Sequence, residues 1–277
     1  MIPVYSKATI IKGVRVKGTM PYKGALTTED WVRHLKDQAA HTEEHRHTLY
    51  EKVNIHNKMN ILDVGCGTGV ITADIASLTK GRVTGIDIDC KKLDRAKPLV
   101  SDRITLLEAD ASHLPFKDET FDLAVFSVVL MHIQDKQKAV NEMARVTQKN
   151  GIVLATMEPD HGGALYYPEN KMYPFFIKDV EEMGSDPYIG RKLKYLFGKA
   201  GLKTEIGMYT YDFDSMNNNK EQLKDFLNRF WIAEKLFLKN GWTQQQIHNY
   251  KREQIHLIEN DLYFSFLPVF YSIGTKG

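Results

Sequence analysis

One acidic residue and three glycines have the spacing with the clearest chemical meaning in this sequence. The order is Asp63-x-Gly65-x-Gly67-x-Gly69, and residues 61–64 have the apolar character of a short buried strand. Because glycine has no Cβ, a turn of this kind lets the backbone lie against a ligand. A strand before such a turn and helical apolar spacing after it are typical of the cofactor site in a doubly wound α/β fold. The segment therefore predicts a cofactor site at the turn.

The spacing of the glycines separates two classes of cofactor. A nicotinamide fingerprint has a small residue three positions after its second glycine, but Val70 stands at that position here. The alternating pattern instead resembles the first motif of the class I S-adenosylmethionine-dependent methyltransferases, an acidic residue followed by alternating glycines. A glycine turn in some other α/β protein is the alternative, so the segments that follow must decide.

A second acidic residue lies where doubly wound sites bind a ribose. Residues 83–86 predict a second strand, and Asp87 ends this apolar run. In such sites a carboxylate about 20 residues further along the chain accepts hydrogen bonds from the ribose hydroxyls. We assign this role to Asp87, because Asp89 is better placed to cap the next helix. Ile88, between the two acids, is included among the expected cofactor contacts.

The next segments occur in the order that the resemblance implies. Asp110 and Ala111 follow a third strand at residues 104–107 and match the positions that meet the adenine in this family. A carboxylate can accept from the exocyclic amine, and a backbone N–H can donate to a ring nitrogen. A fourth strand over residues 121–127 ends at Ser127, where the loop that should cover the sulfonium begins.

His132, in the loop after the fourth strand, is the candidate catalytic base. Ligands bind at the carboxyl edge of open α/β sheets, and the usual pKa of histidine suits proton removal from a hydroxyl or ammonium group. A helix-start or packing role is the alternative. In-line methyl transfer mainly requires the nucleophile to be held about 3 Å from the methyl carbon, so a base is optional.

The segment after a fifth strand at residues 152–157 offers a candidate acceptor site. Glu158 and His161 leave that strand at the same sheet edge, and a carboxylate there could bind an amine or steer a hydroxyl. A simple turn capped by these residues is the alternative. Tyr166 and Trp231 belong to a set of aromatic residues that favours an apolar or aromatic small molecule, although core packing would also explain them.

A helix expected from residue 28 to about 53 precedes the first strand. Thr27 and Asp30 have the pattern of a capped helix start. The resemblance implies that this helix lies across the cofactor and that Gln38 and Arg46 approach its methionine carboxylate. A solvated helix face is the alternative for both residues.

Three histidines on the same predicted helix have a superficial likeness to a metal site. His41 and His45 are four residues apart, on one helix face, and His47 follows. No cysteine and no metal-binding motif accompanies them. We therefore predict no metal ion.

The C-terminal half departs from the simplest form of the fold. A helix should end at Asn150-Gly151 and another should start at Asp186-Pro187, before a sixth strand at residues 203–211. A seventh strand, antiparallel, is expected at residues 262–273. The intervening stretch is far longer than an ordinary loop and predicts two helices, the second with a capping box between Thr243 and Gln246.

The expected fold is α/β, with a doubly wound, mostly parallel seven-stranded sheet and an antiparallel last strand. Residues 1–58 should form an N-terminal segment with the cofactor-covering helix. Residues 59–215 together with 261–277 should form the methyltransferase core, and residues 216–260 a helical cap inserted between strands six and seven.

Composition limits the broad class of the protein. The chain has 277 residues, 43% hydrophobic and 26% charged, which suits a globular core. A formal net charge of +2 gives no electrostatic argument for nucleic acid binding. Cys66 and Cys90 are too few for a disulfide scaffold and suit a reducing cytoplasm. Neither a transmembrane run nor a signal-peptide core is present, so we expect no membrane partner.

The sequence thus predicts a cytoplasmic enzyme that moves a methyl group from S-adenosyl-L-methionine to a small-molecule acceptor with an oxygen, nitrogen or carbon nucleophile. A protein or RNA methyltransferase is the alternative among enzymes. A catalytically silent S-adenosylmethionine-binding module is the alternative outside them.

Overall fold

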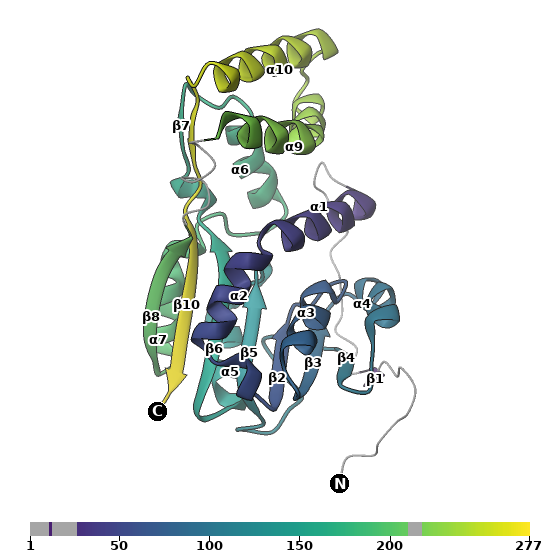
Figure 1. Ribbon diagram of the computed structural model, residues 1–277, viewed down its shortest axis with the longest axis vertical. Coiled ribbons are helices and arrows are strands. Elements are labelled where there is room, and N and C mark those ends of the chain that lie inside the picture. Colours follow the sequence, from purple (N-terminus) through teal and green to yellow (C-terminus); the bar gives the residue numbers. More distant parts are fainter. Residues whose placement is uncertain (1–10, 13–26, 210–217) are drawn as a thin grey trace.

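The computed structural model describes residues 11–12, 27–209 and 218–277, with helices on both faces of one large sheet (Figure 1). Its strands are β1 (Ile11–Lys12), β2 (Asn60–Val64), β3 (Arg82–Asp87), β4 (Ile104–Glu108), β5 (Phe121–Ser127), β6 (Thr147–Pro159), β8 (Leu202–Tyr209) and β10 (Val269–Lys276). The order is β1-β4-β3-β2-β5-β6-β10-β8. Strands β1 to β6 pair in parallel, whereas β10 runs antiparallel to β6 and β8. The predicted mostly parallel sheet is confirmed, and the two-residue β1 extends one edge.

Helices cover this sheet and extend beyond it. They are α1 (Thr28–His41), α2 (Glu43–Lys52), α3 (Val70–Leu78), α4 (Cys90–Ala96), α5 (Lys136–Val146), α6 (Tyr173–Glu182), α7 (Leu193–Lys199), α9 (Asn219–Lys239) and α10 (Gln244–Glu259), with short 3-10 helices η3 (Leu130–His132), η4 (His161–Gly163) and η5 (Gly190–Lys192). A second, two-stranded sheet pairs β7 (Leu165–Tyr167) with β9 (Phe264–Phe266).

Neighbouring residues of β2 pack into opposite halves of the core. Leu62 and Val64 lie with Met143 of α5 and Phe197 of α7, whereas Ile61 belongs to the cluster built with α2, α3 and α4. A parallel sheet buried on both faces reads as a continuous apolar run rather than an alternating one. This explains why the central strands were predictable from short apolar segments.

The predicted N-terminal helix is two helices in the structure. The capping box between Thr27 and Asp30 is present at the start of α1. The helix is interrupted at Thr42, which separates α1 from α2. The Arg46 guanidinium donates to the Ala39 carbonyl (2.7 Å) and to the Thr42 hydroxyl (2.6 Å). A buried side chain therefore satisfies the polar groups that the break exposes, and local periodicity gave no sign of it.

The pair Asn150-Gly151, expected to end a helix, lies inside β6. In β6, Thr147 pairs with Phe121 of β5, and Ile152 pairs with Leu123. Five steps along β6 therefore correspond to two steps along β5, so β6 bulges outward between these pairs. Asn150 takes a left-handed conformation with φ of 61°, which asparagine tolerates better than most residues. A turn signal in the sequence thus marks a bulge in a strand here and not the end of a helix.

Two other predicted boundaries are wrong. The seventh strand begins at Val269 rather than at residue 262, because residues 264–266 pair with β7 in the small sheet. Asp186 and Pro187 do not start a helix: the Asp186 carboxylate accepts from the Tyr188 N–H (3.0 Å) in a turn, and η5 and α7 follow.

The predicted helical pair is present between β8 and β10. The Thr243–Gln246 capping box starts α10, and Trp242 stacks on Phe237 of α9 with ring centroids 4.1 Å apart. In Figure 1, α6, α9 and α10 form a helical layer beyond the end of the sheet to which β5 points. Lys235 of α9 pairs with Asp30 of α1, so this layer is tied to the N-terminal helix.

Among the helices of the described residues, none combines the length and the apolar character that a membrane crossing requires.

Candidate cofactor and acceptor site

The glycine turn between β2 and α3 has one open position. Gly65, Gly67 and Gly69 all have positive φ angles, of 70°, 54° and 76°. A Cβ on Gly65 would lie 2.6 Å from Val129, and one on Gly69 would lie 2.8 Å from Ala96, but no atom of the described residues lies within 4 Å of the corresponding position at Gly67. Two of the glycines thus allow close packing of the protein on itself, and Gly67 faces free space.

Asp87 borders this space at the end of β3. Its carboxylate accepts hydrogen bonds from the Gly67 N–H (2.9 Å) and the Asp89 N–H (2.8 Å). Asp89 caps α4 instead, accepting from the Lys91 N–H at 2.9 Å. The carboxylate of Asp87 is therefore held beside the turn with lone pairs to spare, and the capping role predicted for Asp89 is confirmed.

Asp63 lies beneath the turn rather than in it. Its side chain is 3% exposed and accepts from the Thr72 hydroxyl of α3 at 2.6 Å. Burial raises the pKa of Asp63 to about 7, and the charge of Asp87 acts in the same direction. Asp63 thus joins β2 to α3 and supports the glycine turn, and its direct contact with the cofactor stays a prediction.

The candidate adenine residues project from neighbouring strand ends. Asp87 pairs with Glu108 in the register of β3 and β4, which brings Ile88 and Asp110 to the same edge. Ile88 is 46% exposed, unusual for a large apolar residue. Burial alone would raise the pKa of Asp110, but hydrogen bonds from Ser112 outweigh it and the pKa lies below its usual value. Ala111, half-buried, follows Asp110.

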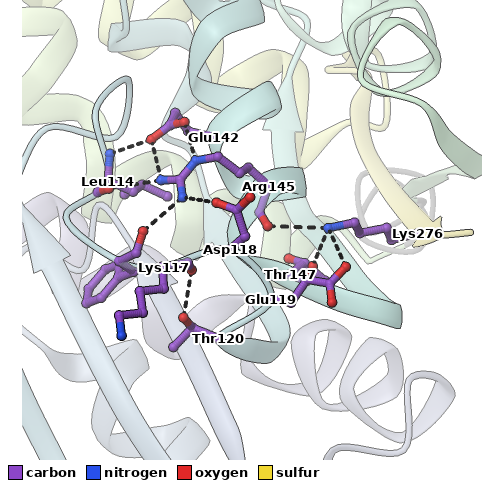
Figure 2. A network of polar contacts seen from close by, with 10 residues as sticks. Leu114, Lys117, Asp118, Glu119, Thr120, Glu142, Arg145, Thr147 and Lys276 are labelled. Atoms are coloured by element: carbon purple, nitrogen blue, oxygen red, sulfur yellow. Dashed lines mark hydrogen bonds and ion pairs between the residues drawn. The ribbon is translucent and has the colours of Figure 1, made fainter. Parts of the chain in front are cut away.

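The loop after Asp110 is anchored by a pair of residues that the sequence analysis did not single out (Figure 2). Glu142 of α5 accepts from the Leu114 N–H (2.8 Å), and Arg145 donates to the carbonyls of Leu114 (3.0 Å) and Phe116 (2.9 Å). The hydrogen bond from Arg145 lowers the pKa of Glu142. The Glu142-x-x-Arg145 spacing on one helix face was the available signal.

Ser127, at the end of β5, is half-buried. His132 is the last residue of η3, in the loop that follows. Although His132 as a whole residue is exposed, the protein around its ring disfavours the charged form and lowers the pKa to about 4, with Lys92 and Lys136 adding to the effect. The Nδ1 atom lies 2.9 Å from the Ser185 hydroxyl. His132 is therefore a neutral, oriented imidazole near pH 7, and a weaker base than a histidine with the usual pKa.

Glu158 does not reach an acceptor position. Its side chain is fully buried, and Oε1 accepts from the Val129 N–H at 2.7 Å and the Leu130 N–H at 3.3 Å. The sequence placed this residue at the correct sheet edge, but its side chain turns under the loop instead of facing outward.

His161 and Tyr166 belong to an aromatic cluster near the same edge. The His161 Nδ1 lies 3.0 Å from the Tyr173 hydroxyl, and the His161 ring is 4.8 Å from that of Phe176. The Tyr166 and Tyr173 rings are 4.7 Å apart. Both predicted residues are half-buried and could form part of an acceptor wall.

Arg46, expected near the methionine carboxylate, is 1% exposed. Besides its bonds at the break between α1 and α2, its guanidinium donates to Asp74 of α3 at 3.2 Å. Gln38 is half-buried on α1. The charge of Arg46 thus serves the packing of α2 on α3, and its approach to the methionine carboxylate stays a prediction.

Trp231 of α9 lies between cations. The Arg33 guanidinium is 5.1 Å and the Lys235 ammonium 5.8 Å from its ring. This environment, where α9 meets α1, differs from the apolar acceptor wall that the sequence suggested, and the acceptor contact of Trp231 stays a prediction.

Glu43, His47 and Asp74 have ligand atoms within 4.8 Å of one another in the described part of the chain. His47 is already 2.7 Å from one Asp74 oxygen, and Arg46 pairs with the other. A cation would compete with the arginine, so this group carries no metal assignment.

Known proteins resemble this chain in sequence and fold. Residues 62–155 match a family described as a methyltransferase domain. A demethylmenaquinone methyltransferase of Staphylococcus aureus is 30% identical over 193 residues, covering 66% of this chain and 74% of that protein. A methyltransferase of Streptomyces halstedii is 34% identical over 108 residues, 37% of this chain and 39% of its own length.

Among solved structures, a Haemonchus contortus phosphoethanolamine N-methyltransferase in complex with S-adenosylhomocysteine has a TM-score of 0.57 at 17% identity, covering 84% of this chain and 52% of that one. At this identity the likeness concerns the fold. The chain spans 39% to 54% of the length of the first curated relatives that it matches.

Three findings agree with one another: the glycine turn with its open position, the carboxylate beside it, and the extended match to the Staphylococcus aureus enzyme. The chain belongs to the class I S-adenosylmethionine-dependent methyltransferases, and its cofactor is S-adenosyl-L-methionine.

Proposed function

We propose that this protein transfers a methyl group from S-adenosylmethionine to a small-molecule acceptor by in-line displacement at an oxygen, nitrogen or carbon nucleophile. The observation that carries the proposal is the open space at Gly67, bordered by the Asp87 carboxylate, at the sheet edge where the His132 loop also lies. When bound there, the cofactor supplies an electrophilic methyl group on a sulfonium.

The residues of the cofactor side would act by position. The free lone pairs of Asp87 suit the ribose hydroxyls, and the backbone at Gly67 can approach the ligand without a side chain in between. The exposed side chain of Ile88 offers an apolar surface for the adenine ring. Asp110 and the Ala111 N–H would meet the adenine edge.

On the acceptor side, His132 would take a proton from the nucleophile or orient it, using the nitrogen that Ser185 leaves free. The aromatic cluster around His161 and Tyr166 supports an acceptor with an apolar or aromatic body. In-line transfer needs mainly close approach and alignment, and a recessed aromatic wall can provide both.

The alternatives predict different substrates. A formal net charge of +2 gives little attraction for RNA, and the relatives described above include an enzyme named as a demethylmenaquinone methyltransferase. A silent binding module would form no S-adenosylhomocysteine at all.

The test is incubation with S-adenosylmethionine and a metabolite pool, followed by mass spectrometry for a metabolite that gains one methylene. Failure of every pool to yield S-adenosylhomocysteine would overturn the proposal. A cytoplasmic location remains a prediction from cysteine usage.

Replacing Asp87 should weaken cofactor binding selectively. We expect Asp87→Ala to lose roughly 1.5–3 kcal/mol of S-adenosylhomocysteine affinity, if both ribose bonds are charge-assisted, which is roughly 10- to 100-fold in Kd. Asp89→Ala is the matched control: it should cost about 1 kcal/mol of stability through the lost cap and leave the Kd nearly unchanged. Calorimetry that finds equal affinities for the wild type and Asp87→Ala would remove the ribose assignment.

We propose that residues 216–260 act as a lid, residues 1–58 as the cofactor-covering segment, and residues 59–215 with 261–277 as the core; within these ranges, residues 1–10, 13–26 and 210–217 lie outside the described part of the chain. Closing a lid excludes water and is often slow compared with chemistry. Amide exchange in α9 should therefore slow when cofactor and acceptor are both bound, with α7 as the internal control. Identical exchange of α9 in the free and bound states would make the cap a packing element only.

A further inference from the structure

The loop between β5 and α5 rests on one buried carboxylate. Glu158 has no exposed surface, and its Oε1 accepts from two successive backbone donors, the N–H groups of Val129 and Leu130. The other oxygen, Oε2, is buried and has no hydrogen-bond partner among the residues that the structure describes. A buried carboxylate is costly unless its hydrogen bonds compensate, so the bonds to this loop are its main compensation.

The loop held by Glu158 begins with a strained residue. Val128 has a φ of 54°, a left-handed conformation that a β-branched side chain rarely adopts and that persists only where the surroundings enforce it. The Val128 N–H donates to the Met157 carbonyl at 2.7 Å. Two successive residues of β6, Met157 and Glu158, therefore hold the strained residue from both of its sides.

The same loop touches both halves of the site. The Val129 side chain fills the space beside Gly65, where a Cβ would come within 2.6 Å of it. Three residues further on, His132 ends the loop with Nδ1 at 2.9 Å from the Ser185 hydroxyl. A displacement at Val129 and Leu130 would therefore disturb the glycine turn and the imidazole together.

We propose that Glu158 is a positioning residue for methyl transfer: its carboxylate fixes the strained loop so that Val129 backs the glycine turn and His132 faces the acceptor. This inference rests on the proposed function, but its structural part concerns the loop alone. The role needs an acceptor oxygen and no negative charge. Burial raises the pKa of Glu158 to about 7, and the neutral acid retains an oxygen that can accept from the loop.

A positioning role for Glu158 predicts different outcomes for two substitutions. Glu158→Gln keeps an acceptor oxygen at the same distance and should preserve the loop. Glu158→Ala leaves the Val129 and Leu130 N–H groups buried without partners, so their amide exchange should accelerate by at least about tenfold. S-adenosylhomocysteine affinity should fall by roughly 3- to 10-fold, because Val129 no longer supports the turn, and kcat should fall more than KM rises.

Asp160→Ala is the matched control. Asp160 is 2% exposed and lies two residues further along the chain, but it pairs with Arg191 at 2.6 Å and does not contact the loop. This variant should leave amide exchange at Val129 and Leu130 unchanged. If Glu158→Ala does not fold, Glu158→Asp replaces it, since the shorter side chain withdraws the carboxylate from the loop and should also accelerate exchange there.

Exchange and S-adenosylhomocysteine binding are measured on the full chain without turnover, so these results do not depend on finding an acceptor. Unchanged exchange and affinity in the Ala and Asp variants would overturn the positioning role. Loss of activity in Glu158→Gln with wild-type exchange would also overturn it, because the charge would then act on the reaction directly. Failure of the wild type to methylate any acceptor would instead count against the proposed function.

Discussion

Valine at position 67 should abolish measurable cofactor binding at concentrations that saturate the wild type. Within the described part of the chain, no atom lies within 4 Å of a Cβ at position 67, so a new side chain would extend into this space without a clash and would occupy the place of the ligand. We expect Gly67→Val to raise the Kd for S-adenosylhomocysteine by at least about 100-fold, or about 2.7 kcal/mol. Isothermal titration calorimetry measures this directly.

Gly201→Val separates lost binding from backbone strain. Gly201 also has a positive φ, of 78°, with nothing within 4 Å of its missing Cβ, but it lies in the turn between α7 and β8. Both variants carry the strain of a β-branched residue in the left-handed region, so both should lower the melting temperature. Only Gly67→Val should lose the cofactor, and equal Kd values for the two variants would show that the open space belongs to no ligand.

His132→Ala should lower the rate of the chemical step by roughly two to four orders of magnitude if the imidazole takes a proton. Cofactor affinity should stay within about threefold of the wild type, because His132 lies on the acceptor side of the loop. Single-turnover kinetics with a saturating acceptor separates the two effects. His248→Ala, an exposed histidine on α10, is the control and should have wild-type rates.

The pH profile gives a second test of His132. Enclosure by the protein lowers the pKa to about 4, so the neutral, proton-accepting form is present at pH 7 and is lost only as the pH falls through about 4. The wild-type rate should therefore remain level from about pH 6 down to about pH 5 and then decline, and this decline should be missing in His132→Ala. A mutant with near-normal turnover would leave catalysis to positioning alone.

Features that depend on neighbouring residues in the chain were predictable. The strand at Phe121–Ser127 matches its predicted bounds, because a buried parallel strand needs only a short apolar run. The capping boxes that begin with Thr27 and Thr243 were read from spacing alone. The positions of Asp87 at the end of a strand, beside the glycine turn, and of Asp89 at the start of a helix also followed from the local sequence.

Features that depend on distant parts of the chain were not predictable in the same way. Asn150-Gly151 has the local form of a helix end, but pairing with β5 makes it a bulge. The charge of Arg46 was expected to face the cofactor, and the break at Thr42 together with Asp74 of α3 draws it inward. The sequence places Glu158 at the right sheet edge, but only the folded loop gives its carboxylate two backbone donors.

The sequence by itself therefore determined the central strands, the glycine turn and the positions of the acids around it, because short apolar runs, turns and caps are set by residues close together in the chain. Tertiary structure alone decided which polar side chains face the ligand and which are buried beneath it. The physical reason is that a buried charge must find hydrogen-bond partners wherever the fold brings them, and for Arg46 and Glu158 those partners come from helices and loops that converge only in the folded protein.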